Sequence, residues 1–130
     1  MGETNGRKIG LMPWADLTVP DAAAVKEFYR RVVGWTVTEV DMGGYSDFCM
    51  NEPEGAQTVA GICHARGVNA ALPPVWLVYI TVADVEKAAA LAVELGGTVM
   101  HGPTPMGPQG RYCVVRDPAG AVAALYEQRA

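Results

Sequence analysis

The chain has 130 residues, half of them apolar, which is enough for one domain with a single core. Ten basic and fourteen acidic side chains give a formal charge of −4, and no Lys/Arg cluster stands out, so we expect no nucleic acid partner. The apolar run 73–83 is far shorter than the roughly 20 residues of a membrane span, so we expect no membrane partner either.

Cysteine usage and the N-terminus point to a cytoplasmic location. Cys49, Cys63 and Cys113 are odd in number and scattered, which fits a reducing compartment better than a disulfide framework. The first ten residues contain no apolar segment of the kind that precedes a signal cleavage site. We therefore expect a cytoplasmic protein.

The first predicted elements are a strand at about 14–19 and a helix that Asp21 caps. Apolar residues recur at helical spacing after this cap. They are Ala22, Val25, Phe28, Tyr29 and Val32. Gly34 then suits a left-handed helix end, because glycine adopts that conformation at little cost. The segments "WTVTEV", "YSDFCMN" and "QTVAGICHA" predict three further strands between residues 35 and 65.

The same order of elements recurs 63 residues later. The segment "LTVPD" at 17–21 aligns with "ITVAD" at 80–84, and Asp84 is expected to cap a second helix. Strands are predicted at 98–101, 111–116 and 121–128. In both repeats a turn of the type acidic residue, proline, any residue, glycine precedes the last strand.

Each repeat therefore contains a strand, a helix and three more strands. The first repeat covers about 10–64, the second about 75–128, and residues 65–74 connect them. One repeat is too small to bury both its helix and its sheet, so we expect one domain over residues 1–130. The predicted fold class is α+β.

A βαβββ unit given twice, with "FYRRVVGW" ending the first helix and "RDPAG" before the last strand, resembles the vicinal oxygen chelate superfamily. This superfamily includes glyoxalases, bleomycin-resistance proteins and extradiol dioxygenases, so it hosts several chemistries. The resemblance covers about residues 10–127. It implies that the two units form a curved mixed sheet, or cup, with helices on the outer face, and that the protein is a homodimer.

The resemblance also implies where a metal would bind in metal-dependent members, on the first and last strands of both repeats. Those positions hold Trp14, Val59, Leu77 and Ala124. None of these side chains offers a lone pair suited to a divalent cation. A noncanonical site would need other donors, namely His64, His101, Asp16, Asp47 and Glu127. We therefore expect no metal and no other cofactor.

Strand alternation predicts which side chains line the cup. The expected ligand-binding residues are Trp14, Asp16, Phe48, Leu77, Tyr79, Tyr112, Ala124 and Tyr126. Alternation does not fix the faces of Phe48 and Tyr112. Indole, phenol and aliphatic groups with one carboxylate suit a small, largely apolar or aromatic organic ligand. The alternative is that Trp14 and Tyr79 fill this space as core.

The proline- and glycine-rich segment 100–112, with Met106 in its middle, resembles the loop that borders the cup in members of the superfamily.

Three functions remain open. The first is a metal-free protein that binds a small organic molecule. The second is a metal-independent enzyme in which Asp16 or a tyrosine transfers a proton. The third is a metal-dependent lyase or dioxygenase of the glyoxalase type with atypical ligands.

Overall fold

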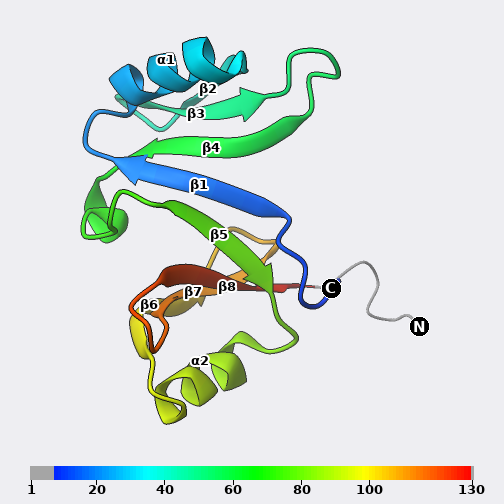
Figure 1. Cartoon of the computed structure of the whole chain (residues 1–130), viewed down its shortest axis with the longest axis vertical. Coiled ribbons are helices and arrows are strands. Elements are labelled where there is room, and N and C mark those ends of the chain that lie inside the picture. The colour runs from blue at the N-terminus through cyan, green and yellow to red at the C-terminus, as the bar shows by residue number, and fades with distance from the viewer. Residues whose placement is uncertain (1–7, 130) are drawn as a thin grey trace. The chain divides into compact units, whose positions relative to one another are not determined.

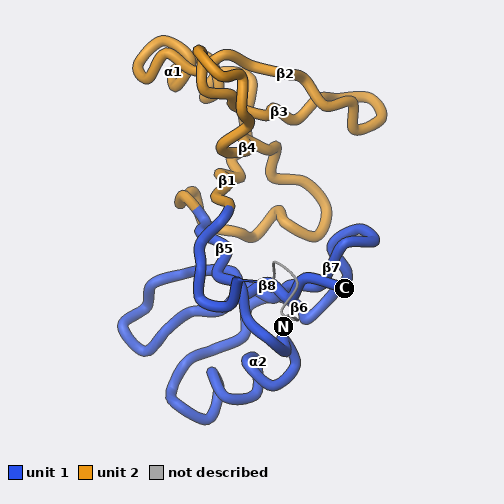
Figure 2. Tube along the Cα trace, turned by 90° about the vertical axis from the view of Figure 1, so that its right-hand side faces the viewer, with its two compact units in different colours: residues 1–13, 77–130 blue, residues 14–76 orange. Residues whose placement is uncertain are grey.

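The computed structural model describes residues 8–129, and it divides into two compact units. Figure 2 colours them separately: unit 2 comprises residues 14–76, and unit 1 comprises residues 1–13 and 77–130. Both units contain the order strand, helix, strand, strand, strand (Figure 1). The predicted α+β class and the two tandem βαβββ repeats are confirmed.

Unit 2 contains the first repeat. Its elements are β1 (Trp14–Val19), α1 (Ala22–Val33), β2 (Thr36–Asp41), β3 (Ser46–Asn51) and β4 (Thr58–His64). The strands pair in the order β2-β3-β4-β1, with β1 parallel to β4 and the other two pairings antiparallel. A short 3-10 turn, η1 (Gly67–Asn69), follows β4.

Unit 1 repeats this arrangement with the second half of the chain. Its elements are β5 (Trp76–Thr81), α2 (Val85–Glu94), β6 (Thr98–Pro105), β7 (Gly110–Arg116) and β8 (Val122–Gln128), although Trp76 itself falls in unit 2. The strand order is β5-β8-β7-β6, with β5 parallel to β8. The four strands of unit 1 therefore have the same internal topology as those of unit 2.

Each helix packs on one face of the strands of its own unit. In unit 2 the buried core on this face consists of Leu17, Val19, Ala22, Phe48, Met50, Ala60 and Ile62. In unit 1 it consists of Val85, Ala89, Cys113 and Val115. Because strand side chains alternate, the intervening residues point to the opposite side, which we call the helix-free face.

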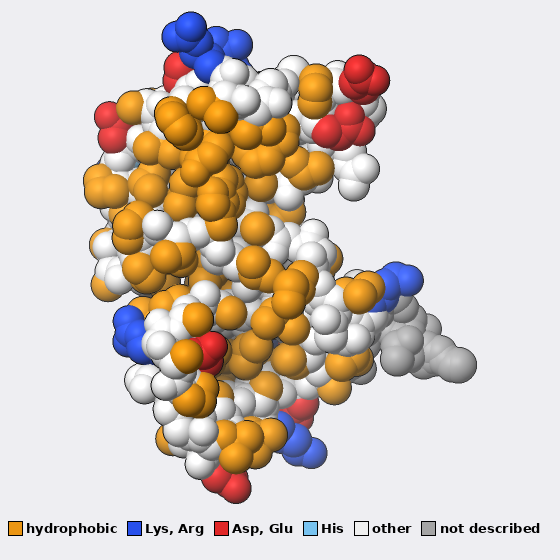
Figure 3. Space-filling model, in the orientation of Figure 1, with side chains coloured by type: hydrophobic (Ala, Val, Ile, Leu, Met, Phe, Trp, Pro, Cys, Tyr) orange, Lys and Arg blue, Asp and Glu red, His pale blue; other side chains and the backbone are white. Residues whose placement is uncertain are grey.

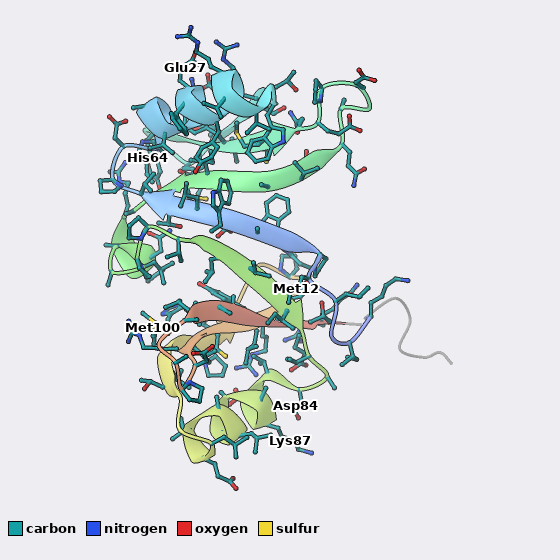
Figure 4. The ribbon with its side chains drawn as sticks, viewed as in Figure 1. Met12, Glu27, His64, Asp84, Lys87 and Met100 are labelled. Atoms are coloured by element: carbon teal, nitrogen blue, oxygen red, sulfur yellow. The ribbon has the colours of Figure 1, made fainter. Side chains whose placement is uncertain are left out.

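The predicted helix boundaries are confirmed by the hydrogen bonds at their ends. Asp21 Oδ1 accepts from Ala24 N at 3.1 Å, and Asp84 Oδ1 accepts from Lys87 N at 3.0 Å. Figure 4 shows Asp84 and Lys87 together at the start of α2. Gly34 ends α1 with φ of 93°, the left-handed conformation that glycine adopts without strain.

The turns before the last strands are also held by their acidic residues. Glu52 Oε1 accepts from the N–H groups of Glu54 and Gly55, and Asp117 Oδ1 accepts from Ala119 and Ala121. These bonds fix the turns locally, so the sequence signature and the structure agree.

The segment 100–112 differs from the expected loop. Strand β6 continues to Pro105 and pairs with β7, and only residues 106–109 connect the two strands. The edge position of β6 explains this. One side of an edge strand has no partner strand, so a proline whose nitrogen faces that side removes no hydrogen bond between strands. The expected loop between the strands predicted at 98–101 and 111–116 is therefore confined to residues 106–109.

Neither helix in the described part of the chain has the length and apolar character to traverse a bilayer. On the side of the molecule seen in Figure 3, Lys and Arg side chains stand in separate small groups rather than in a continuous stripe.

Candidate functional site

Trp14 and Asp16 lie on the helix-free face of unit 2. Trp14 Nε1 donates to Asp16 Oδ2 at 3.2 Å, and both side chains lie against Gly61 of the adjacent strand β4. A Cβ at Gly61 would lie 3.2 Å from Trp14 Cζ2 and 3.3 Å from Asp16 Cβ. The glycine therefore leaves the space that the indole occupies.

The positions where the superfamily would place metal ligands do not fit a cation. The residues are Trp14, Val59, Leu77 and Ala124, whose side chains carry no oxygen, sulfur or imidazole nitrogen. At the first of them the indole packs over Gly61. Among residues 8–129, no three His, Cys, Asp or Glu side chains are grouped to hold a metal ion.

Two of the candidate carboxylates for a noncanonical site bond to backbone N–H groups. Asp47 Oδ1 accepts from the backbone N of His64 at 2.8 Å and lies 3.4 Å from His64 Nδ1. Glu127 Oε1 accepts from Val85 N at 2.9 Å, at the start of α2. These two carboxylates hold local structure within their own units.

Cys63 also belongs to the helix-free face of unit 2, opposite Thr18 in the strand register. Burial, followed by the nearby carboxylates of Asp16 and Asp47, raises the pKa of its thiol to about 12. At neutral pH this thiol stays protonated, so it is not an activated nucleophile.

The helix-free face of unit 1 brings together five of the expected ligand-binding residues. They are Leu77, Tyr79, Tyr112, Ala124 and Tyr126. Strand pairing places Tyr79 beside Ala124 and Tyr112 beside Tyr126, and these residues alternate with Cys113 and Leu125, which pack with α2. The rings of Tyr79 and Tyr112 have centroids 6.1 Å apart. Tyr112, whose face the sequence left open, thus shares this face.

Tyr126 borders the turn before β7. Its hydroxyl donates to the backbone oxygen of Gln109 at 3.2 Å. A Cβ at Gly110 would lie 2.8 Å from this hydroxyl oxygen and 2.4 Å from the backbone oxygen of Glu127. Gly110 therefore permits a close approach of β7 to Tyr126. The Tyr126 hydroxyl in turn bonds to the 106–109 connection through Gln109.

Phe48 does not share a face with Trp14 and Asp16. It pairs with Ile62 in β4 and belongs to the core beneath α1, and Lys26 of α1 lies over its ring at 5.2 Å. The physical reason is register, because Cys49 rather than Phe48 lies opposite Gly61. Phe48, whose face the sequence left open, is therefore a core residue of unit 2 and does not line the helix-free face with the other expected ligand-binding residues.

One open depression lies elsewhere in unit 2, along the outer side of α1. It has a volume of about 460 Å³ and is lined by Ala24, Glu27, Phe28, Arg31 and Val32. Phe28 and Val32 are exposed there. None of the expected site residues contributes to it.

Comparison with known proteins gives a family match over most of the chain. Residues 11–125 match the Glyoxalase/Bleomycin resistance protein/Dioxygenase superfamily. CFP32 of Mycobacterium tuberculosis, named as a glyoxylase, is 32% identical over 119 residues, or 91% of this chain and 46% of that protein. The anthracycline biosynthesis protein DnrV of Streptomyces peucetius is 30% identical over 133 residues, or 92% and 47%. The chain thus spans about half the length of these relatives.

Solved structures with the same fold are more distant in sequence. A methylmalonyl-CoA epimerase from Mycobacterium tuberculosis superposes with a TM-score of 0.57 at 15% identity, covering 93% of this chain and 89% of that one. The protein BH1468 from Bacillus halodurans gives 0.60 at 14% identity, covering 95% and 97%. These likenesses concern the fold alone.

Proposed function

Because the chain belongs to the Glyoxalase/Bleomycin resistance protein/Dioxygenase superfamily, we propose that it binds a small, largely apolar or aromatic organic molecule without a metal. The helix-free face of each unit, taken by itself, supplies candidate binding residues. They are Trp14 and Asp16 in unit 2, and Leu77, Tyr79, Tyr112, Ala124 and Tyr126 in unit 1.

The packing of Trp14 over Gly61 carries this proposal. A metal-dependent site would need a donor atom at this position, and an indole bonded to Asp16 supplies none. The half-buried rings of Trp14, Tyr112 and Tyr126 instead offer flat apolar surfaces with a few polar groups, whereas Tyr79 is buried as part of the core. Such surfaces suit aromatic ligands.

The names of the relatives support an aromatic ligand class. DnrV and its counterpart DauV are named as anthracycline biosynthesis proteins, and anthracyclines contain flat hydroxylated ring systems. We therefore take a flat hydroxylated aromatic compound as the ligand class for this chain.

We further propose that the protein is cytoplasmic and forms a homodimer. A molar mass in solution of twice 13.8 kDa tests the dimer.

Metal analysis of protein purified without chelators tests the metal-free character. We expect no stoichiometric divalent ion, and removal of trace metal with a chelator should leave ligand affinity unchanged. A stoichiometric ion that is required for binding would contradict the proposal and favour a lyase or dioxygenase.

Titration with 1,4-dihydroxyanthraquinone tests binding directly, with tryptophan fluorescence as the readout. Trp14 lies on the helix-free face, whereas Trp35 packs with the core beneath α1. We expect Trp14→Phe to weaken binding and remove most of the quenching, and Trp35→Phe to leave binding unchanged. Equal affinity in both variants, or no binding by the wild type, would contradict the proposal.

Asp16→Asn separates binding from catalysis by a metal-independent enzyme. The amide oxygen of asparagine still accepts from Trp14 Nε1, so a binding protein should keep its affinity within about fivefold. An enzyme that uses Asp16 to transfer a proton should bind the compound and fail to convert it. Conversion of the compound by wild-type protein, lost in Asp16→Asn, would favour the enzyme.

A further inference from the structure

His101 lies on the helix-free face of unit 1, and it is not one of the four positions where the superfamily would place metal ligands. It pairs with Val114 of β7, whereas Val99, two residues earlier, packs with the core beneath α2. Simple alternation would put residues 99 and 101 on the same face. The register shift between them, a β-bulge, turns His101 to the other side.

Gly102 holds this bulge close to the neighbouring strand. Its φ is 79°, and a Cβ there would lie 2.7 Å from the backbone oxygen of Tyr112. Only glycine combines this conformation with this approach. The backbone of β6 thereby brings the His101 ring to the Tyr112 ring, with centroids 5.6 Å apart and planes at 52°.

The Nε2 atom of His101 is buried and has no hydrogen-bond partner within residues 8–129. Buried polar atoms in proteins are almost always bonded, and an unbonded one costs about 1–3 kcal/mol. Bulges that re-aim a side chain are frequent beside functional sites. A ligand that reaches Nε2 would supply the missing bond.

The surroundings of Nε2 define the chemistry of that ligand. Tyr112 lies against the imidazole, and the buried ring of Tyr79 has its centroid 6.1 Å from that of Tyr112, so three rings follow one another on this face. The strand partners of His101 and Val114, which are Val114 and Ala124, are uncharged and fully buried. A neutral aromatic group fits such a row better than an anion, which would need a counter-charge.

We propose that His101, Tyr112 and Tyr79 form a subsite for a neutral aromatic ring that carries a hydroxyl group, with the hydroxyl bonded to His101 Nε2. A hydroxyl both donates and accepts, so it satisfies Nε2 in either tautomer of the imidazole. This inference rests on the proposed function and adds the group that gives it specificity.

The test compares two probes, 2-naphthol and 2-methoxynaphthalene, which share a ring system and differ in the hydroxyl proton. Binding is measured by calorimetry for wild-type protein and for His101→Phe, with His64→Phe as the matched control in unit 2. We expect His101→Phe to reduce the preference for 2-naphthol by about fivefold or more, because it removes one hydrogen bond. His64→Phe should keep the wild-type preference, and His101→Gln should restore part of it.

The outcomes separate the subsite from the broader proposal. If both probes bind and the preference is the same in His101→Phe, the subsite is wrong and the binding function stands. If neither probe binds the wild type, both are wrong. A second measurement needs no variant: in ¹⁵N spectra of wild-type protein, saturating 2-naphthol should shift the Nε2 signal of His101, and an unchanged signal would overturn the subsite.

Discussion

Cys63 shows how the helix-free face of unit 2 controls the chemistry of a single residue. Burial and the carboxylates of Asp16 and Asp47 raise the pKa of its thiol to about 12. Burial, together with the carboxylate of Asp16 that we propose for ligand binding, therefore suppresses thiolate formation at Cys63. A cysteine in this setting serves packing rather than nucleophilic catalysis.

We predict that the Cys63 thiol reacts very slowly in the folded protein. A pKa of about 12 instead of 9.0 lowers the thiolate fraction at pH 8 by about 1,000-fold. Alkylation with iodoacetamide, followed by mass spectrometry of the peptides, measures this rate in native and denatured protein. Asp47→Asn should speed the reaction, whereas Asp21→Asn, at the helix cap, should not. Alkylation of native Cys63 at the denatured rate would contradict this prediction.

The same pKa shift gives stability a definite pH dependence. The folded state holds the Cys63 proton more tightly than the unfolded state, so its contribution is complete below pH 9 and is lost as pH rises toward 12. Burial raises the pKa of Cys113 too, which acts in the same direction. Urea unfolding at pH 8 and pH 10 should show a smaller decline in Cys63→Ala than in wild type. An equal decline would contradict the assignment to Cys63.

Gly61 should be intolerant of any larger side chain because of Trp14. A Cβ would already lie 3.2 Å from the indole, and valine adds two methyl groups. We expect Gly61→Val to displace Trp14, break its bond to Asp16 and destabilise the protein by about 1–3 kcal/mol. Trp14→Ala should remove most of this penalty, so the double variant tests the contact. Additive effects in denaturant unfolding would contradict it.

At the scale of elements, the helix caps are simple to test. Asp21→Ala removes the acceptor for Ala24 N, and we expect a loss of about 1 kcal/mol in the free energy of unfolding. Asp21→Asn should lose much less, because asparagine is an equally good N-cap. Thermal or urea unfolding measures both. Equal losses would show that charge rather than capping matters at this position.

The elements that the sequence predicted correctly depend on local chemistry. Asp21, Asp84 and Gly34 act within one helical turn, and Asp117 acts within its own turn, so short motifs identify them. Such signals need no knowledge of the partner strand. This is why the order of residues along the chain is enough to reveal the two βαβββ repeats.

The elements and faces that could not be predicted from the sequence depend on pairing with distant strands. The extension of β6 and the turning of His101 arise from its register with β7, and the position of Phe48 arises from its register with β4. A shift of one residue moves a side chain to the other face. Alternation therefore indicated the faces of Trp14 and Tyr79 in unbroken strands, but it could not indicate that of His101 beyond a bulge.

At the scale of the whole molecule, a shared fold does not imply shared chemistry. Structures at 14–15% identity share the fold, while the metal positions here hold Trp14, Val59, Leu77 and Ala124. Membership of the superfamily thus fixes the arrangement of the strands, and the side chains on the helix-free faces decide what binds.

We predict that the two units fold as one cooperative domain. Unit 2 comprises residues 14–76, and a chain of about 60 residues buries only about 60% of the surface exposed on unfolding. Calorimetry of the full chain should therefore show a single transition with equal calorimetric and van't Hoff enthalpies. A fragment of residues 14–76 should lack the near-ultraviolet circular dichroism of packed Trp35 and unfold without a cooperative transition. Two separate transitions in the full chain, with the fragment reproducing one of them, would instead establish two independent domains.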